Sequence, residues 1–148
     1  MCHSDESRPP APPTRGVVIG HHDRTLTASD GNIFDAYEAH PETDSHVGFV
    51  ILPDIRGLHT YYKDLAVRFA EAGYHAIAFD YYARTAGRGD RSDAFEYMPH
   101  WKSTTPAGVD ADVDACVAKL RANGVQHIFT VGFCFGGTNS WRQAAVRN

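Results

Sequence analysis

The first third of the chain changes from alternating to continuous hydrophobicity. Residues 23 to 28 and 32 to 39 alternate apolar and polar positions, and the turn sequence SDG over residues 29 to 31 separates them. Alternation on both sides of an Asp-Gly turn predicts a β-hairpin. The next segment, HVGFVILP over residues 46 to 53, is apolar nearly throughout. Such a run is typical of a strand that is covered on both faces in a parallel sheet.

Helical and strand patterns alternate through the middle of the chain. Residues 60 to 73 carry apolar side chains at helical spacing, with Thr60 as the expected N-cap and Gly73 as the expected stop. Residues 75 to 82 form a second continuous apolar segment, which predicts another buried strand. We expect a long irregular connection from there to about residue 105.

The last third predicts a helix, a strand and the start of another helix. Residues 106 to 123 have one apolar stripe, and residues 126 to 133 form a third buried strand that leads into a glycine-rich turn. A hairpin followed by alternating strands and helices predicts an α/β fold with a mostly parallel sheet and right-handed crossovers. Ligands of such sheets bind beyond the carboxyl ends of the strands. The candidate sites are therefore the loops after residues 53 and 82, and the glycine-rich turn.

The composition restricts the class of protein. The chain has 148 residues, of which 43% are hydrophobic and 22% charged, and its net charge is −4. This size fits one globular domain, and the charge does not favour nucleic acid as a partner. No apolar segment approaches the length of a bilayer span, so we expect no membrane partner. No oligomeric state is predicted.

The amino-terminal residues and the cysteines further restrict the class of protein. Residues 1 to 15 hold four of the eight prolines and no continuous apolar segment, so we expect a disordered tail without a secretory signal, ahead of a domain over residues 16 to 148. The three cysteines are far apart in the sequence and have neither disulfide nor zinc spacing. We therefore expect no metal, no cofactor and a reducing, cytoplasmic location.

The glycine-rich turn carries the strongest chemical signal. Residues 132 to 137 (GFCFGG) fit a nucleophile elbow, a sharp strand-to-helix turn, with a thiol in place of the usual hydroxyl. Glycines two before and two after Cys134 let strand and helix approach closely, and the helix N-terminus favours the thiolate. The N–H of Phe135 would point at a developing oxyanion.

Two other interpretations of this turn exist. A phosphate-binding turn needs glycine motifs that the sequence lacks. A buried structural cysteine is the second, because free cysteine is often interior. A nucleotide-dependent oxidoreductase would fit the parallel sheet as a function class, but its glycine motif is also missing. The flanking glycines and the strand-to-helix context favour the elbow.

Three motifs together resemble the dienelactone hydrolase family of α/β-hydrolases. They are GFCFGG, LPDIRGL over residues 52 to 58, and DYYARTAG over residues 80 to 87. They stand in the family's order, and the resemblance extends from about residue 24 to the end of the sequence. It implies an α/β-hydrolase-type sheet with strand order 1-2-4-3-5, and hydrolysis of a small-molecule ester or lactone substrate.

The resemblance also implies roles for individual residues. Cys134 matches the nucleophile, and Asp54 stands where the family usually has a glutamate that contacts the resting thiol. The N–H groups of Ile55 and Phe135 match the oxyanion hole. Arg84 matches an arginine that engages the substrate carboxylate, and a solvent-exposed loop arginine is the alternative.

Part of the family's catalytic machinery is missing from the sequence. An α/β-hydrolase has its acid and its histidine after the nucleophile, but the fourteen residues after Cys134 include no His, Asp or Glu. His59 and His100 are upstream alternatives for a base. The family's sheet has three further strands, so we expect an N-terminal part of a longer hydrolase, incomplete at the C-terminal side, with residues 126 to 133 as an exposed apolar edge.

Two functional hypotheses follow. In the first, the parent protein is a cysteine-dependent ester or lactone hydrolase, inactive as the 148-residue chain because the downstream acid and histidine are absent. In the alternative, the chain is an inert remnant or a binding module that keeps the pocket for a small molecule.

Overall fold

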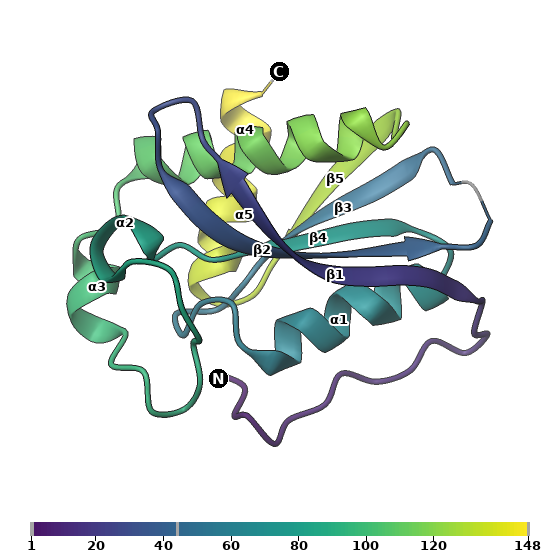
Figure 1. The fold of residues 1–148 in the computed structure, drawn as a ribbon, viewed down its shortest axis with the longest axis horizontal. Coiled ribbons are helices and arrows are strands. Elements are labelled where there is room, and N and C mark those ends of the chain that lie inside the picture. Colours follow the sequence, from purple (N-terminus) through teal and green to yellow (C-terminus); the bar gives the residue numbers. More distant parts are fainter. Residues whose placement is uncertain (1, 44, 148) are drawn as a thin grey trace.

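Five strands form one mixed sheet that helices cover on both faces (Figure 1). The computed structural model describes residues 2–43 and 45–147. The strands are β1 (Val18–Thr27), β2 (Ile33–Pro41), β3 (Val47–Leu52), β4 (His75–Phe79) and β5 (His127–Gly132). The helices are α1 (Thr60–Glu71), α2 (Ala83–Ala86), α3 (Met98–Lys102), α4 (Pro106–Ala122) and α5 (Phe135–Val146). The strand order is β1-β2-β4-β3-β5, which confirms the order that the resemblance implies.

The predicted hairpin and the predicted parallel strands are both present. β1 and β2 pair antiparallel up to Thr27 and Ile33, and Gly31 in the turn between them has φ +88°, a conformation that favours glycine. β2 is antiparallel to β4, whereas β3 runs parallel to both β4 and β5. The hairpin strands are longer than the sequence predicts.

Successive residues of β3 face two separate cores. Val50 and Leu52 belong to the cluster that α4 covers, and Ile51 belongs to the cluster that α1 covers. All three side chains are fully buried. This two-sided burial explains why the central strands have no polar alternation.

The start of α1 differs from the prediction. His59, and not Thr60, is the N-cap, and its side chain makes no capping hydrogen bond. The His59 ring is buried beside Asp54, so tertiary packing fixes the extended backbone that precedes the helix. The predicted stop is confirmed, because Gly73 follows the helix with φ +93°.

The connection after β4 is more ordered than predicted and contains the short helices α2 and α3. β4 ends at Phe79, and the following Asp80 forms an ion pair with Arg91 in which Oδ2 and Nη2 are 2.9 Å apart. Both side chains are buried, and the Arg91 guanidinium lies 4.4 Å from the centre of the Phe95 ring. This pair holds the connection against the end of the sheet.

β5 lies at one edge of the sheet, and in the described part of the chain only β3 pairs with it. Phe129 on β5 is 54% exposed, and Trp141 on the neighbouring α5 is 84% exposed. The exposed apolar edge that the sequence predicts is therefore present. Of the helices that the structure describes, none is long and apolar enough to cross a membrane.

Glu38 of β2 is a buried carboxylate surrounded by basic side chains. His40 Nε2 lies 3.3 Å from Glu38 Oε1, Lys119 Nζ lies 3.7 Å from Oε2, and Arg24 donates a hydrogen bond to Oε1. Burial acts to raise the pKa of Glu38, but the hydrogen bonds from His40 and Arg24 outweigh it and lower the pKa from 4.5 to about 2.

This arrangement predicts a specific acid sensitivity. A depressed carboxyl pKa stabilises the fold fully above pH 4.5, and the stabilisation is lost as the pH falls through about 2. Glu38→Gln should therefore lower the free energy of unfolding near neutral pH, and the difference from the wild type should shrink between those two values. Urea unfolding over this pH range measures it. The exposed Glu42→Gln is the control, and a Glu38→Gln difference that is independent of pH would contradict the prediction.

Candidate active site

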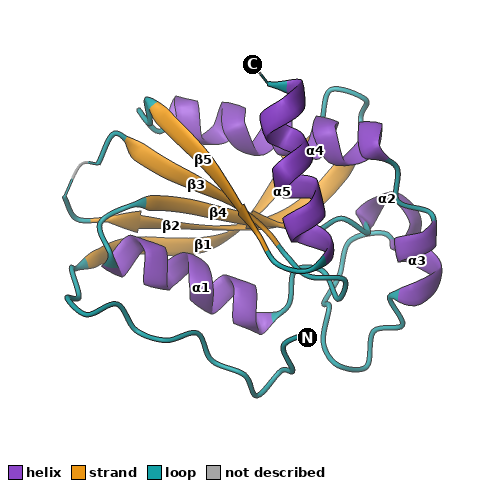
Figure 2. Cartoon of the chain, turned by 180° about the vertical axis from the view of Figure 1, so that it is seen from behind, coloured by secondary structure: helices purple, strands orange, loops and turns teal. Residues whose placement is uncertain are grey.

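Cys134 lies in the sharp turn between β5 and α5, and Figure 2 shows this turn at the carboxyl end of β5. Its backbone has φ +53° and ψ −114°, and among the described residues no other non-glycine residue has a positive φ. Such a conformation costs about 1–3 kcal/mol and persists only where surrounding packing imposes it. The thiol is exposed, as the predicted elbow requires.

Glycines on both sides of Cys134 make the turn possible. A Cβ atom on Gly132 would lie 2.0 Å from the carbonyl oxygen of Gly136, and a Cβ atom on Gly136 would lie 2.0 Å from that of Leu52. Both distances are far inside van der Waals contact with backbone atoms that have no freedom to move. The spacing G-x-C-x-G therefore reflects contact between the helix start and two strands.

Two backbone N–H groups near this turn are available to a ligand. In the residues that the structure describes, neither the N–H of Phe135 nor that of Ile55 has a hydrogen-bond acceptor. Phe135 is the first residue of α5, and Ile55 lies in the turn after β3. Because β3 and β5 are adjacent and parallel, with Leu52 paired to Gly132, these two turns lie at the same end of neighbouring strands.

Asp54 follows β3 and is fully buried. Its carboxylate accepts hydrogen bonds from the N–H of Arg56 at 2.8 Å and the N–H of His3 at 3.1 Å. Burial acts to raise the pKa of Asp54, but His59 and the two N–H groups outweigh it and hold the pKa below its ordinary value. Asp54 is therefore a carboxylate at neutral pH.

The two upstream histidines lie in different surroundings. His59 Nε2 is 3.7 Å from Asp54 Oδ2, and its buried ring lies edge-on to Tyr62 with ring centres 5.0 Å apart. His100 instead has Nδ1 2.9 Å from the hydroxyl of Thr85 in α2. Of the two, the structure brings His59 to the candidate site residue Asp54.

Arg84 in α2 is occupied by partners within the chain. Its guanidinium forms ion pairs with Asp30 of the hairpin turn and with Asp112 of α4, and it donates to the carbonyl of Gly108 at 3.1 Å. The hydrogen bonds to these carboxylates raise the pKa of Arg84 in spite of its partial burial. A substrate carboxylate would have to compete with Asp30 and Asp112, and the predicted role of Arg84 stays a prediction.

The first residues of the chain lie at this site, which no pattern in the sequence predicts. Residues 2–15 form no helix or strand, yet the His3 ring stacks on Tyr61 with ring centres 3.5 Å apart. Cys2 precedes His3 in the chain, and burial together with the charges of Asp54 and Cys134 raises the pKa of its thiol. Because residues 1 to 15 have no apolar pattern, the sequence does not predict these contacts, and Cys2 is the one residue there that could have suggested a role at this site.

This arrangement defines a class of protein. A mixed sheet in the order β1-β2-β4-β3-β5, with a strained residue at a glycine-flanked turn between strand and helix, is the fold of an α/β-hydrolase. The strained residue of that fold stands between a parallel strand and the helix that follows it, as Cys134 does after β5.

Comparison with known proteins identifies the family. The model of the "Dienelactone hydrolase family" matches residues 34–148, which is most of the chain, and the chain belongs to this family. The chain is 31% identical over 139 residues to a "Putative carboxymethylenebutenolidase" of Yersinia pestis, covering 89% of the chain and 50% of that protein. It is also 31% identical over 107 residues to a "Probable 2-oxo-3-(5-oxofuran-2-ylidene)propanoate lactonase" of Bradyrhizobium sp, covering 70% of the chain and 43% of that protein.

A solved structure agrees with these sequence matches. The "Putative Dienelactone Hydrolase" of Klebsiella pneumoniae subsp. pneumoniae superposes with a TM-score of 0.68 at 28% identity, covering 87% of this chain and 56% of that one. The chain therefore spans about half the length of the relatives it matches.

The glycine contacts predict a sharp contrast between neighbouring substitutions. Gly136→Ala should lower the free energy of unfolding by about 3 kcal/mol, because the new methyl group meets backbone. Gly137→Ala should change it by less than about 1 kcal/mol, because its Cβ would lie 3.3 Å from the Gly132 carbonyl oxygen and alanine favours the helix. Denaturant unfolding of both variants tests this, and equal losses would contradict it.

Proposed function

We propose that this chain carries the nucleophile and the oxyanion-binding groups of a hydrolase for small esters or lactones, with Cys134 as the nucleophile. The observation that carries the proposal is the exposed thiol on a strained turn, beside the two N–H groups of Phe135 and Ile55 that lack an acceptor in the described part. Membership of the dienelactone hydrolase family supports the same reaction class.

The proposed reaction begins with attack by the Cys134 sulfur on the substrate carbonyl carbon. The electrons of the carbonyl bond move to its oxygen, and the resulting oxyanion accepts hydrogen bonds from the N–H groups of Phe135 and Ile55. When this intermediate collapses, the carbon–oxygen bond to the alcohol breaks, the alcohol oxygen takes up the proton that the thiol lost, and an acyl group is left on the sulfur. Water then attacks the thioester, which releases the acid and restores the thiol.

Asp54 and Arg84 have supporting roles in this proposal. Asp54 is a buried carboxylate fixed by the N–H of Arg56, and we assign it the contact with the resting thiol that the family resemblance implies. Aspartate is shorter than the family's glutamate, so this contact requires a closer approach of the turn. Arg84 would bind a substrate carboxylate in exchange for Asp30, its more exposed partner.

The substrate class and the extent of turnover follow from further observations. The similarity to a relative named as a lactonase supports a lactone as substrate.

The fourteen residues after Cys134 include no His, Asp or Glu. The 148-residue chain would therefore accept an acyl group but lack the base that speeds its release. A net charge of −4 and three free cysteines favour a small-molecule substrate in a reducing, cytoplasmic compartment.

An activated ester separates acylation from turnover. With the chain reduced by a phosphine, p-nitrophenyl acetate should release nitrophenolate in a burst of up to one equivalent, followed by slow steady release. Mass spectrometry of the intact chain should show one added acetyl group, and mapping of tryptic peptides should locate it on residues 122–142.

Matched variants decide the outcome. Cys134→Ala should abolish the burst, and Cys116→Ala should keep it, because Cys116 lies on the fully buried side of α4. A folded, reduced chain that is never acylated would overturn Cys134 as the nucleophile. Rapid repeated turnover that depends on Cys134 would overturn the proposed lack of a base.

A further inference from the structure

The segment before β1, residues 2–15, runs along α1 and is called the strap here (Figure 1). At its carboxyl end, the N–H of Gly16 donates to the carbonyl of Glu71, the last residue of α1, at 2.6 Å. Further along, Arg8 Nε lies 3.6 Å from Asp64 Oδ2 on the same helix. From Arg8 to Gly16 the chain therefore runs along α1 in the same direction as the helix and reaches its carboxyl end.

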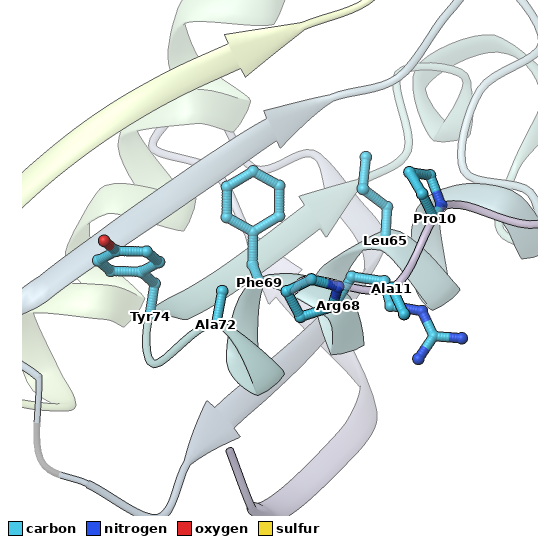
Figure 3. A pocket seen from close by; sticks show the side chains of 8 residues that line it. Pro10, Ala11, Leu65, Arg68, Phe69, Ala72 and Tyr74 are labelled. Atoms are coloured by element: carbon cyan, nitrogen blue, oxygen red, sulfur yellow. The ribbon is translucent and has the colours of Figure 1, made fainter. Parts of the chain in front are cut away.

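The middle of the strap packs against the apolar side of α1. Pro10 and Ala11 lie over the helix and, with Leu65 and Ala72, line a groove of about 240 Å³ (Figure 3). Of the described residues that line this groove, none carries a thiol or a carboxylate, so we assign the groove no part in the reaction. Proline restricts the strap's backbone, which lowers the entropy lost on docking.

The amino end of the strap is anchored at the candidate active site. The N–H of His3 donates to Asp54 Oδ2 at 3.1 Å, and the carbonyl of His3 accepts a hydrogen bond from Arg56. The His3 ring lies parallel to Tyr61, within 6°, with ring centres 3.5 Å apart. Three separate contacts thus hold one residue over the turn that follows β3.

A second anchor ties the strap to the connection after β4. The N–H of Asp93 donates to Asp5 Oδ2 at 2.6 Å, and the N–H of Asp5 lies 3.3 Å from both carboxylate oxygens of Asp93. Arg56 forms ion pairs with both aspartates. The strap is therefore tied both to the turn after β3 and to the connection after β4.

These anchors bring two thiols together. The His3 ring lies edge-on to Phe133, with ring centres 6.4 Å apart, and each of these residues is the chain neighbour of a cysteine. Cys2 and Cys134 are both exposed, so a small oxidant reaches them from solvent. The third cysteine, Cys116, is fully buried.

We propose that Cys2 and Cys134 form a reversible intramolecular disulfide under hydroperoxide, which locks the strap over the candidate active site. The bond itself depends only on the geometry of the strap. Its consequence, loss of acylation at Cys134, rests on the proposed function. Reduction by a small thiol releases the strap and restores the nucleophile.

The reaction has two balanced steps. Hydrogen peroxide transfers one oxygen to the Cys134 sulfur, giving a sulfenic acid and one water molecule. The Cys2 sulfur then attacks the Cys134 sulfur, the sulfur–oxygen bond breaks, and the hydroxyl leaves as a second water with the Cys2 proton. The two thiols lose two electrons and two protons in total, and the peroxide is reduced to water.

The rate of the second step should depend on pH, because the surroundings of Cys2 change the pKa of its thiol. Burial, and then the charges of Asp54 and Cys134, raise the pKa of the Cys2 thiol above its ordinary value. Because the thiolate is the attacking form, closure of the disulfide should become faster as the pH rises from neutral into the alkaline range.

Peptide mapping tests the bond directly. The reduced 148-residue chain is treated with about one equivalent of hydrogen peroxide, blocked with iodoacetamide and digested with trypsin without reduction. We expect the intact monomer to lose the mass of two hydrogen atoms. We expect peptide 1–15 to be joined to peptide 122–142, while Cys116 stays alkylated, after denaturation, on the separate peptide 103–119.

Variants test the role of the strap in this bond. Cys2→Ser should abolish the cross-link and let Cys134 oxidise further to sulfinic acid. His3→Ala removes the stacking on Tyr61 and should slow the cross-link several-fold, whereas Cys116→Ala should leave its rate unchanged. Sulfinic acid at Cys134 in the wild type without the cross-link, or a cross-link found only in dimers, would overturn the proposal.

The same samples separate this proposal from the proposed function. The cross-link and its reversal by dithiothreitol are read by mass, without any substrate. A cross-link that forms in a chain never acylated by the ester would overturn the proposed function alone. A chain that is acylated but never cross-linked would overturn the disulfide alone.

Discussion

The contact between Gly136 and the carbonyl of Leu52 is the constraint on which the candidate site depends. It presses the start of α5 against the end of β3, at a distance that a single methyl group would prevent. Because Gly132 meets Gly136 equally closely, the chain between them has no way to turn except through the strained conformation of Cys134. Backbone packing, and not any side-chain contact, thus sets the direction of the thiol.

The parallel pairing of β3 and β5 brings the remaining groups together. Their paired ends, Leu52 and Gly132, are each followed within three residues by a group of the candidate site, Ile55 on one strand and Cys134 and Phe135 on the other. Neighbouring parallel strands end at the same edge, so residues far apart in sequence become adjacent without a dedicated loop. The same turn after β3 holds the Asp54 carboxylate, to which the strap attaches.

The sequence was informative where local chemistry decides the structure. The Asp-Gly hairpin, the continuous apolar strands and the glycines around Cys134 each carry their own signal, and the resemblance supplied the strand order. It failed where distant residues decide. The N-cap of α1 is set by burial of His59 beside Asp54, and the short helices α2 and α3 lie in a connection that the Arg91–Asp80 pair holds against the sheet. The strap docks through polar and stacking contacts that have no periodic pattern.

The position of Cys2 has a practical consequence for work with this protein. Residues fused ahead of the strap would emerge beside the Cys134 thiol and the Arg56–Asp93 anchor, since the strap ends there. An affinity tag at the amino end would therefore lie at the mouth of the candidate site, and a polyhistidine tag would bring metal-binding imidazoles to an exposed thiol. The end of α5 lies on the far side of the molecule from the amino end (Figure 1). A tag placed there would therefore leave the candidate active site undisturbed.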